Sequence, residues 1–253
     1  MAQPDDRRFS GIERLFGVPG AARIARAHVA VVGIGGVGSW AAEALARSGV
    51  GQLTLIDMDH VAESNINRQI HATDASLGQS KVLAMRERIH AFHPQCDVQC
   101  VDAFVTPDNW PSLLPKKVDA VIDACDQLAA KTAMAVWARS TQTVFISVGA
   151  AGGKRRAHAV EVADLSAVTH DPLLAKLRYR LRREFGAPRD GKKMGLSCVF
   201  SAEAVAAPDP SCGIDSDGSL NCHGFGSLVT VTATFGQCAA GIILDKLASS
   251  KSN

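Results

Sequence analysis

Residues 31–40, VVGIGGVGSW, decide the fold of this chain. They place Gly33, Gly35, Gly36 and Gly38 between an apolar run and a segment with helical periodicity. Glycines at this spacing allow a tight turn after a strand and let the backbone approach a phosphate closely. A helix that follows such a turn offers unpaired N–H groups to an anion. We therefore expect this turn to bind a nucleotide, and the next question is which nucleotide.

The segments around the turn predict an alternating α/β chain. Residues 27–33 are short, Val-rich and end at glycine, as buried strands do, and residues 37–50 have a helical apolar pattern. The alternation continues to about residue 152, with strands expected at 51–59, 96–105, 118–126 and 143–150 and helices at 80–94 and 129–140. This order predicts an α/β fold with a Rossmann-like, doubly wound and mostly parallel sheet.

The pattern weakens in the second part of the chain. We expect one domain, with a nucleotide-binding core at residues 1–152 and a C-terminal extension at residues 153–253. Residues 171–185 still predict a helix, with Asp171 as its N-cap and Pro172 in its first turn. The apolar arc of this helix consists of Leu173, Leu174, Leu177, Leu181 and Phe185.

Two further segments complete the extension. Residues 186–224 are dominated by Gly, Pro, Asp, Ser and Cys without a period, which predicts mostly loop, mobile near 186–195 and 206–221. Residues 224–244 carry no charge over 21 positions, a length that would cross a bilayer. Their threonines, glutamine and glycines favour instead a buried helix or strand–helix in the core or at a dimer interface, and membrane contact is the alternative.

Cysteine usage favours a reduced compartment. The chain has seven cysteines, no pair of them has C-x-x-C spacing, and the first residues, MAQPDDRRFSGIERLFG, contain no apolar signal core. We therefore expect a cytoplasmic protein.

The residues after the second expected strand distinguish ATP from a redox dinucleotide. Asp57 lies nineteen positions after Gly38, where an acid that binds ribose hydroxyls is expected. Arg68 and Lys81 follow, and a guanidinium fork with an ammonium suits the charge of a triphosphate. An NAD-dependent dehydrogenase, which needs no such cations, is the less favoured alternative.

Two carboxylates follow the strand expected at 118–126. Asp123 and Asp126 fall at the carboxyl edge of the sheet, where ligands bind in such folds. Carboxylates suit Mg²⁺, which is commonly bound through one or two of them together with phosphate oxygens. A helix N-cap is the other role expected for Asp126.

Taken together, these motifs resemble those of the ubiquitin-activating-enzyme-like (HesA/MoeB/ThiF) adenylyltransferases. The matching pieces are Gly33–Gly38, DMDHVAESNINRQ at 57–69, GQSK at 78–81 and DACD at 123–126. The resemblance implies that ATP and Mg²⁺ adenylate a carboxylate with release of pyrophosphate. It also implies a homodimer, in which Arg14 is the candidate to reach the ATP of the partner.

The resemblance further implies a role for each site residue. Asp57 would hold the ribose, Asn65, Arg68 and Lys81 the phosphates, and Asp126 the Mg²⁺. Four residues would be catalytic, namely Arg14, Arg68, Lys81 and Asp126. The expected nucleotide-binding set is Gly33, Gly35, Gly36, Gly38, Asp57, Asp59, Asn65, Arg68, Gln69, Lys81 and Asp123.

The second half narrows the resemblance to one branch of that family. FVTPDN at 104–109, HDPLLAKLR at 170–178, LSCVFS at 196–201 and GFGSLVTVTATFG at 224–236 look like the branch that acts on threonylcarbamoyladenosine beside the anticodon of tRNA. The expected reaction adenylates the threonyl carboxylate, closes a ring with a neighbouring atom and releases AMP, for a net loss of water. Members that activate sulfur carriers usually have two C-x-x-C pairs for zinc, so we expect no structural zinc here.

A basic segment fits a tRNA substrate independently. Residues 154–193 hold eleven Lys/Arg and five Asp/Glu, a local charge of +6 in a chain whose net charge is +2. Such patches hold RNA phosphates, although a solvated helix face is the commoner meaning of a charge run. The candidates are Lys154, Arg155, Arg156, Arg178, Arg182, Lys192 and Lys193. We expect no DNA partner.

Several roles and functions stay open at this level. Cys198 and Cys222 are more readily buried or incidental thiols than nucleophiles, and no pattern chooses a base among His71, His93 and His223. The enzymatic alternative is activation of the C-terminal glycine of a ubiquitin-like sulfur carrier, with a cysteine desulfurase or sulfur acceptor as partner. The non-enzymatic alternative is an RNA-binding or sulfur-relay adaptor.

Overall fold

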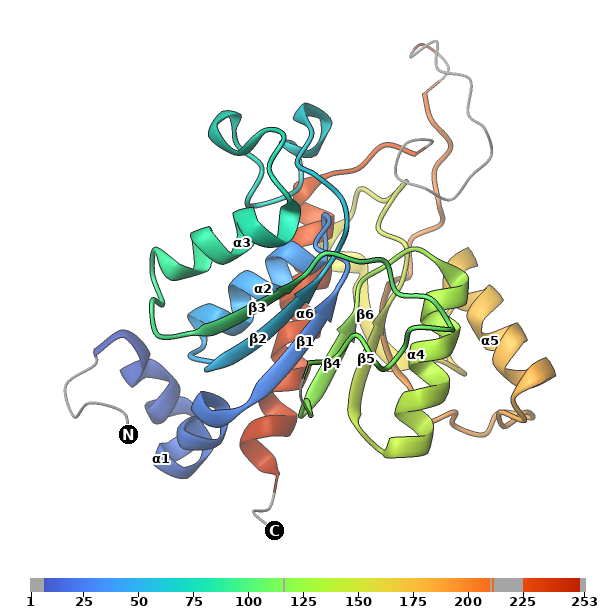
Figure 1. Ribbon diagram of the computed structural model, residues 1–253. Helices are drawn as coiled ribbons and strands as arrows, with labels where there is room; N and C mark the ends of the chain where they lie inside the picture. Colours follow the sequence, from blue (N-terminus) through green and yellow to red (C-terminus); the bar gives the residue numbers. More distant parts are fainter. Residues whose placement is uncertain (1–6, 116, 210, 212–224, 251–253) are drawn as a thin grey trace.

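A single seven-stranded sheet forms the centre of the molecule (Figure 1). The structure is a computed structural model, and it describes residues 7–115, 117–209, 211 and 225–250. The strand order is β3-β2-β1-β4-β5-β7-β6, and only β6 runs antiparallel to its neighbour. The strands are β1 His28–Val32, β2 Gln52–Ile56, β3 Asp97–Val101, β4 Ala120–Asp123, β5 Val144–Val148, β6 Val160–Asp164 and β7 Ser197–Ser201. This architecture confirms the predicted Rossmann-like, mostly parallel α/β fold.

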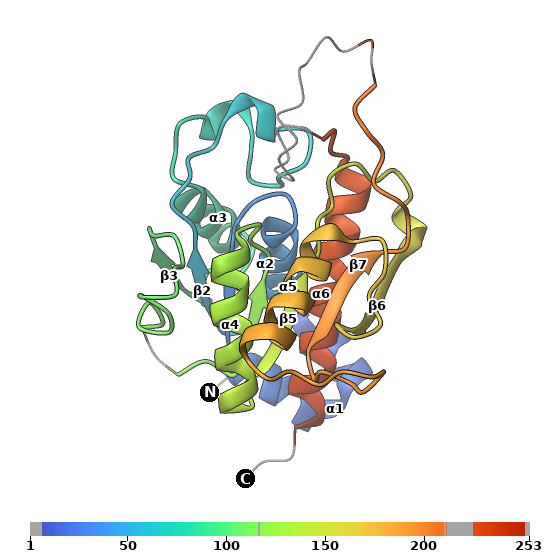
Figure 2. The same ribbon diagram turned by 90° about the vertical axis from the view of Figure 1, so that its right-hand side faces the viewer.

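Helices cover both faces of the sheet (Figure 2). On one face lie α1 Ser10–Arg26, α2 Gly38–Arg47, α3 Lys81–His90 and α6 Val229–Ser249, and on the other lie α4 Leu128–Thr141 and α5 Pro172–Glu184. Short 3-10 helices are η1 Arg7–Phe9, η2 Glu63–Asn65, η3 Asp74–Ser76 and η4 Ala157–Ala159.

Alternation along the strands builds two apolar cores. In β1, Val29 and Val31 belong to the cluster under α2 and α6, whereas Ala30 and Val32 belong to the cluster under α4 and α5. Successive side chains of a strand point to opposite faces, so a strand covered on both faces must be apolar throughout. This requirement explains the apolar runs at residues 29–32 of β1 and 120–122 of β4.

The β1–β4 pair is the topological switch point of the sheet. The chain leaves β1 toward β2 on one side and leaves β4 toward β5 on the other. In the parallel register Val32 lies opposite both Ile56 and Asp123, so the ends of these three strands are level. The glycine turn, the Asp57 segment and the Asp123–Asp126 segment therefore start from one edge, which is where open α/β sheets bind ligands.

The second half contributes more strand than the sequence indicated. Residues 186–224 were expected to be mostly loop, but Ser197–Ser201 form β7, which pairs in parallel with β5 and antiparallel with β6. β6 and β7 are each only five residues long, and so short a stretch of sequence does not show a distinctive hydrophobic periodicity. The part of the mobile segment expected at 206–221 that covers residues 212–221 lies outside the described residues.

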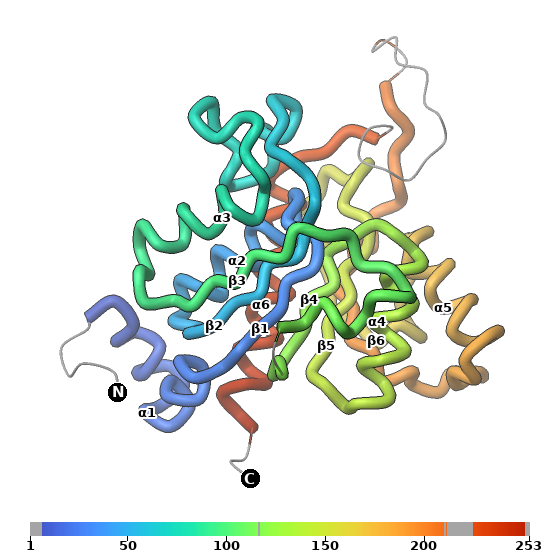
Figure 3. Tube along the Cα trace, viewed as in Figure 1, coloured from blue at the N-terminus to red at the C-terminus, as the bar shows by residue number. Residues whose placement is uncertain are grey.

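The final apolar segment forms a buried helix, as favoured by its threonines and glycines. Helix α6 packs against α2, and a Cβ atom on Gly236 would lie 2.6 Å from the carbonyl oxygen of Val37, so only glycine allows this approach. Its end lies beside α1 (Figure 3), where Arg23 Nε donates to the Ala248 carbonyl at 3.0 Å. Within the described ranges, no helix is long and apolar enough to cross a membrane.

Helix α5 begins as predicted and ends differently. The Asp171 carboxylate accepts the N–H of Leu174 at 2.9 Å, which makes it the N-cap, and Pro172 is the first helical residue. Leu173, Leu174, Leu177 and Leu181 are buried, but Phe185 is 42% exposed. Phe185 is the C-cap residue with a non-helical ψ of 20°, so its inclusion in the apolar arc was wrong.

Candidate nucleotide-binding site

The glycines of the turn have two different roles: some are required by the backbone conformation, and one leaves room for a ligand. A Cβ on Gly38 would lie 1.7 Å from the Gly33 carbonyl oxygen, and Gly33 itself has a φ of +84°. A Cβ on Gly35, by contrast, meets nothing closer than Gln69 Nε2 at 4.0 Å. Gly33 and Gly38 close the turn, whereas Gly35 leaves an open position beside Gln69 that a ligand could fill.

The carboxylate of Asp57 is fixed against this turn. Its Oδ2 accepts the Ile34 N–H at 2.6 Å and its Oδ1 accepts the Asp59 N–H at 2.8 Å. Burial raises the pKa of Asp57, and the nearby Lys81 ammonium and the two backbone donors oppose that rise. The carboxylate therefore stands rigidly at the end of β2, in the place expected for an acid that accepts ribose hydroxyls.

Lys81 begins α3 and points back to the end of β2. Its Nζ lies 2.7 Å from Asp59 Oδ2, and the lysine side chain is buried while half of the Asp59 side chain is exposed. The sequence assigned both residues to the nucleotide. The structure places Asp59 as the partner of Lys81, so the ammonium is held at this edge before any phosphate arrives.

Arg68 is shaped by contacts that the sequence did not indicate. Trp40 Nε1 on α2 donates to the Arg68 carbonyl at 3.0 Å, and Thr232 Oγ1 on α6 lies 3.5 Å from the same oxygen. The Arg68 Nη1 donates to Ser64 O at 2.6 Å and to Asn67 Oδ1 at 2.9 Å. These contacts join three distant segments and fix the arginine beside Gly36.

Two buried polar atoms here have no hydrogen-bond partner among the described residues, namely Arg68 Nε and Gln69 Oε1. Buried polar groups are almost always satisfied, so such atoms beside a glycine turn indicate a missing ligand. Asn65, also predicted for this site, is buried and its Oδ1 accepts the Ala62 N–H at 3.1 Å. One donor and one acceptor beside an open glycine turn fit a polar, anionic ligand such as ATP.

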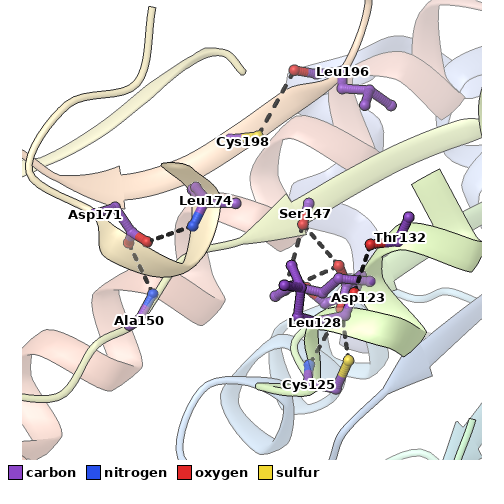
Figure 4. A network of polar contacts seen from close by, with 11 residues as sticks. Asp123, Cys125, Leu128, Thr132, Ser147, Ala150, Asp171, Leu174, Leu196 and Cys198 are labelled. Carbon is purple, nitrogen blue, oxygen red and sulfur yellow. Dashed lines mark hydrogen bonds and ion pairs between the residues drawn. The ribbon is translucent and has the colours of Figure 1, made fainter. Parts of the chain in front are cut away.

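Asp123 corrects one expectation. Its carboxylate is buried and bound by Lys131 Nζ at 2.9 Å, Ser147 Oγ at 2.7 Å and Cys125 Sγ at 3.1 Å (Figure 4). Burial alone would lower the pKa of Lys131, but Asp123 outweighs it and the pKa is raised. The carboxylate of Asp123 is thus committed to the protein interior and does not face a nucleotide.

Asp126 differs from Asp123 in being exposed. Gln127, not Asp126, occupies the N-cap of α4, so the capping role considered for Asp126 is absent. Among the described residues its carboxylate accepts a hydrogen bond only from Gln127 Nε2, at 3.4 Å, so its oxygens stay accessible at the same sheet edge as Lys81.

The cysteine and histidine candidates are mostly structural. Cys198 is fully buried on β7, and burial raises the pKa of its thiol, so it is not a nucleophile. His93 is buried and its Nδ1 lies 3.1 Å from the Ala46 carbonyl. His71 is buried, and burial with the charges of Lys81 and Arg88 lowers its pKa to about 4. Cys222 and His223 lie outside the described residues.

The basic candidates separate into two groups. Lys154 is 2% exposed, and its Nζ donates to the carbonyls of His170 at 2.9 Å, Ser201 and Glu203, so it is not available to RNA and its assignment is corrected. Two half-buried arginines also bind loop carbonyls: Arg178 those of Leu165 and Val168, and Arg182 that of Pro188. Arg155, Arg156, Lys192 and Lys193 are exposed.

Arg14 is not brought to this site. It lies exposed on α1, which leads into the amino end of β1, whereas the glycine turn follows the carboxyl end (Figure 1). Within one chain the structure therefore assembles Asp57, Asn65, Arg68, Gln69 and Lys81 around the turn and leaves Arg14 at the opposite edge.

The fold and this site define a Rossmann-like α/β protein with a glycine turn and two cations, Arg68 and Lys81, at the carboxyl edge of its sheet. The sequence model of the ThiF family matches residues 10–252, and the chain belongs to that family. The family and the sheet predicted from the glycine motif are thereby confirmed.

Relatives match over essentially the whole chain. A tRNA threonylcarbamoyladenosine dehydratase of Haemophilus influenzae is 41% identical over 256 residues, covering 100% of this chain and 98% of that protein. The solved structure of E. coli tRNA N6-threonylcarbamoyladenosine dehydratase, TcdA, in complex with ATP has a TM-score of 0.88 and 43% identity and covers 97% of each chain. Its complex with AMP has a TM-score of 0.87 and 43% identity, covering 98% of this chain and 97% of that one.

Proposed function

We propose that this chain is an ATP-dependent dehydratase of threonylcarbamoyladenosine in tRNA. The observation that carries the proposal is similarity over the full length, including the second half, to dehydratases of that name. The reaction adenylates the threonyl carboxylate beside the anticodon and releases pyrophosphate. A neighbouring atom of the same side chain then closes a ring and AMP leaves, so that the nucleoside loses one water.

The residues around the glycine turn supply binding and charge stabilisation. Asp57 accepts ribose hydroxyls, while Gly35 and Gly36 let the backbone approach the phosphates. Lys81, held at this edge by Asp59, also pairs with a phosphate oxygen, and the Arg68 side chain beside Gly36 supplies a second positive charge. Both cations offset the negative charge that grows on the departing pyrophosphate, and this stabilisation is the main catalytic contribution expected of such a site.

Asp126 is the residue proposed to hold Mg²⁺. No three His, Cys, Asp or Glu side chains of the described residues gather into a metal cluster. A single carboxylate such as that of Asp126 is enough for Mg²⁺, because this ion usually keeps several waters and takes phosphate oxygens as its other ligands. Mg²⁺ bound there would neutralise phosphate charge. Asp123 supports this residue indirectly, since its pair with Lys131 fixes the start of α4.

Ring closure requires no nucleophile from the protein. The acyl adenylate is activated, and an attacking atom in the same side chain has a very high effective concentration. The buried thiol of Cys198 fits this view, because it is neither exposed nor ionised.

We propose a homodimer in which Arg14 reaches the nucleotide site of the second copy. Arg14 lies away from its own site, and α1, which is kinked at Gly17, exposes Leu15 by 74% before the kink and Val18 by 67% after it. A second copy that covers this segment would remove both apolar side chains from water. A cysteine desulfurase or sulfur acceptor has no supporting feature among the described residues.

Exposed cations of the basic segment are proposed to hold the tRNA phosphates. Arg155, Arg156, Lys192 and Lys193 are free of carbonyl contacts through their side-chain nitrogens in the described structure, unlike Lys154 and Arg178. Phosphate contacts of this kind position an RNA without reading its sequence.

Nucleoside mass spectrometry tests the proposal directly. The chain is incubated with ATP, Mg²⁺ and tRNA carrying threonylcarbamoyladenosine, and the tRNA is then digested. We expect the nucleoside to lose the mass of one water and one AMP to form per conversion. Unchanged nucleoside mass without AMP overturns the proposal, and ATP–pyrophosphate exchange that needs a Gly-Gly-ended protein indicates activation of a sulfur carrier instead.

The variant Asp126→Asn tests the metal assignment in the same assay. It should raise the Mg²⁺ concentration needed for half-maximal AMP release, whereas Asp74→Asn, an exposed aspartate on η3, should not. Equal Mg²⁺ dependence in both variants contradicts the assignment to Asp126.

A further inference from the structure

A shallow groove of about 450 Å³, open to solvent, is lined by Leu128 of α4 and by Ala175, Lys176, Tyr179, Arg180 and Glu184 of α5. Both helices lie on the face of the sheet that is turned to the viewer in Figure 2. None of the residues assigned to the nucleotide site lines it.

Tyr179 is the distinctive residue of this groove. It is the only tyrosine of the chain and is 63% exposed, although leucines on the other side of the same helix are fully buried. Its ring is surrounded by cations, with Lys176 and Arg180 in the groove and the Arg183 guanidinium carbon 6.0 Å from the ring centroid. An exposed aromatic ring among cations is the combination that binds single-stranded nucleic acid, where bases stack on rings and phosphates meet Lys and Arg.

The one acid in the groove does not remove this positive charge. Glu184 pairs with Arg180 at 3.0 Å, and both side chains are more than a third exposed. Ion pairs in such positions contribute little and exchange readily for another anion. Lys176 forms no ion pair with any described residue, so the groove keeps a net positive charge toward a polyanion.

The groove lies next to the proposed adenylation site. Leu128, which lines it, is the first residue of α4 and follows Asp126 by two positions. Helix α5 is anchored at the same edge, because the Asp171 carboxylate also accepts the Ala150 N–H at 2.9 Å just after β5 (Figure 4). A strand of RNA whose modified adenosine reaches Asp126 would therefore have a neighbouring nucleotide at this groove.

We propose that the groove binds a nucleotide flanking the modified adenosine, with its base stacked on Tyr179 and its phosphate facing Lys176. This inference rests on the proposed function and adds a specific contact to it. It assigns α5 two roles: its buried leucines hold the fold, and its exposed ring and cations hold the anticodon strand.

Substitutions on one helix test the contact. Tyr179→Ala removes the ring, and Tyr179→Trp and Tyr179→Phe keep a stacking surface. Phe185→Ala removes an exposed aromatic side chain at the C-cap of α5 that does not line the groove. We expect Tyr179→Ala to raise KM for tRNA by roughly 5- to 150-fold, the loss of one stacked base. KM for ATP and the melting temperature should stay as in the parent chain, and Trp and Phe should retain most of the affinity.

Salt dependence separates stacking from charge. Lys176→Ala should reduce the slope of log Kd against log salt concentration by about one contact, whereas Tyr179→Ala should weaken binding at every salt concentration with the slope unchanged. If the parent chain converts tRNA and Tyr179→Ala behaves as Phe185→Ala does, the stacking contact is overturned and the dehydratase proposal stands. If the parent chain leaves tRNA unchanged, the proposed function fails and this inference fails with it.

Discussion

Lys81 Nζ lies 2.7 Å from Asp59 Oδ2, which places a buried ammonium under a half-exposed carboxylate at the carboxyl edge of the sheet. The pair holds the cation in position while no phosphate is present, so little side-chain entropy is lost when a phosphate binds. The same edge carries the open position of Gly35 and the unpartnered Nε of Arg68. The nucleotide site is thus organised before its ligand arrives.

Substituting Lys81 and Asp59 one at a time distinguishes their roles. Lys81→Ala should lower kcat/KM for ATP by roughly 10- to 150-fold, the value of a hydrogen bond to a charged group. Asp59→Asn keeps the ammonium and should have a much smaller effect. The measurement is AMP release against ATP concentration, and equal losses in the two variants would show that Asp59 itself contacts the nucleotide.

Substitutions of two glycines in the turn should distinguish an effect on ATP binding from an effect on the stability of the fold. Gly35→Ala places a Cβ where the nearest atom is 4.0 Å away, so the protein should keep its melting temperature but lose ATP-induced stabilisation. Gly38→Ala places a Cβ 1.7 Å from the Gly33 carbonyl and should destabilise the fold itself. Thermal unfolding with and without ATP measures both effects, and a Gly38→Ala protein as stable as the parent would contradict this division.

His71 should make the fold sensitive to acid. Its pKa is about 4 in the folded chain against 6.5 for an ordinary histidine, so the unfolded chain binds more protons between these values. The stability that the neutral ring provides is complete above about pH 6.5 and is lost as the pH falls toward 4, with a total of about 3 kcal/mol.

His71→Leu should therefore show a smaller loss of unfolding free energy between pH 6.5 and 4 than the parent chain does. Urea unfolding at several pH values measures this difference. His60→Gln, an exposed histidine of the neighbouring loop, is the control and should follow the parent curve. A parent-like pH profile in His71→Leu would refute the assignment.

Breaking the buried pair of Lys131 and Asp123 should destabilise the fold more than breaking any exposed ion pair. Lys131→Met leaves the carboxylate buried without its cation, at a cost of about 3–5 kcal/mol, a large share of the 5–15 kcal/mol typical of a whole protein. The double variant Lys131→Met/Asp123→Asn should be destabilised by less than the sum of the single variants. Additive single effects in urea unfolding would show that the pair is not coupled.

Strong local signals made much of the fold predictable from sequence. The apolar runs at residues 29–32 of β1 and 120–122 of β4 and the capped start of α5 at Asp171 can each be recognised without knowledge of the neighbouring elements. β7 was missed because five residues in a Gly- and Pro-rich region carry no period, and its place in the sheet depends on pairing with β5. Exposure of Phe185 likewise depends on where the helix ends.

The site residues also fall into those that local sequence motifs indicate and those whose environment depends on the tertiary structure. The motifs indicated Asp57, Arg68 and Lys81, because each lies at a fixed spacing from the glycine turn. Sequence could not separate Asp123 from Asp126, since only the position of Lys131 decides which carboxylate is buried. In sequence Lys154 does not differ from its neighbour Arg155, but in the fold its ammonium is enclosed by the carbonyls of His170, Glu203 and Ser201, the last residue of β7.

The contact between Thr232 and Arg68 has a consequence for synthesis of the chain. The two residues are 164 positions apart, and α6 fills the core beside α2 only after it has been made. A nascent chain on the ribosome that lacks α6 has β1 and the glycine turn but neither this support for Arg68 nor the apolar cover over α2. ATP affinity should therefore arise late in translation, when the helix of residues 229–249 has emerged and docked.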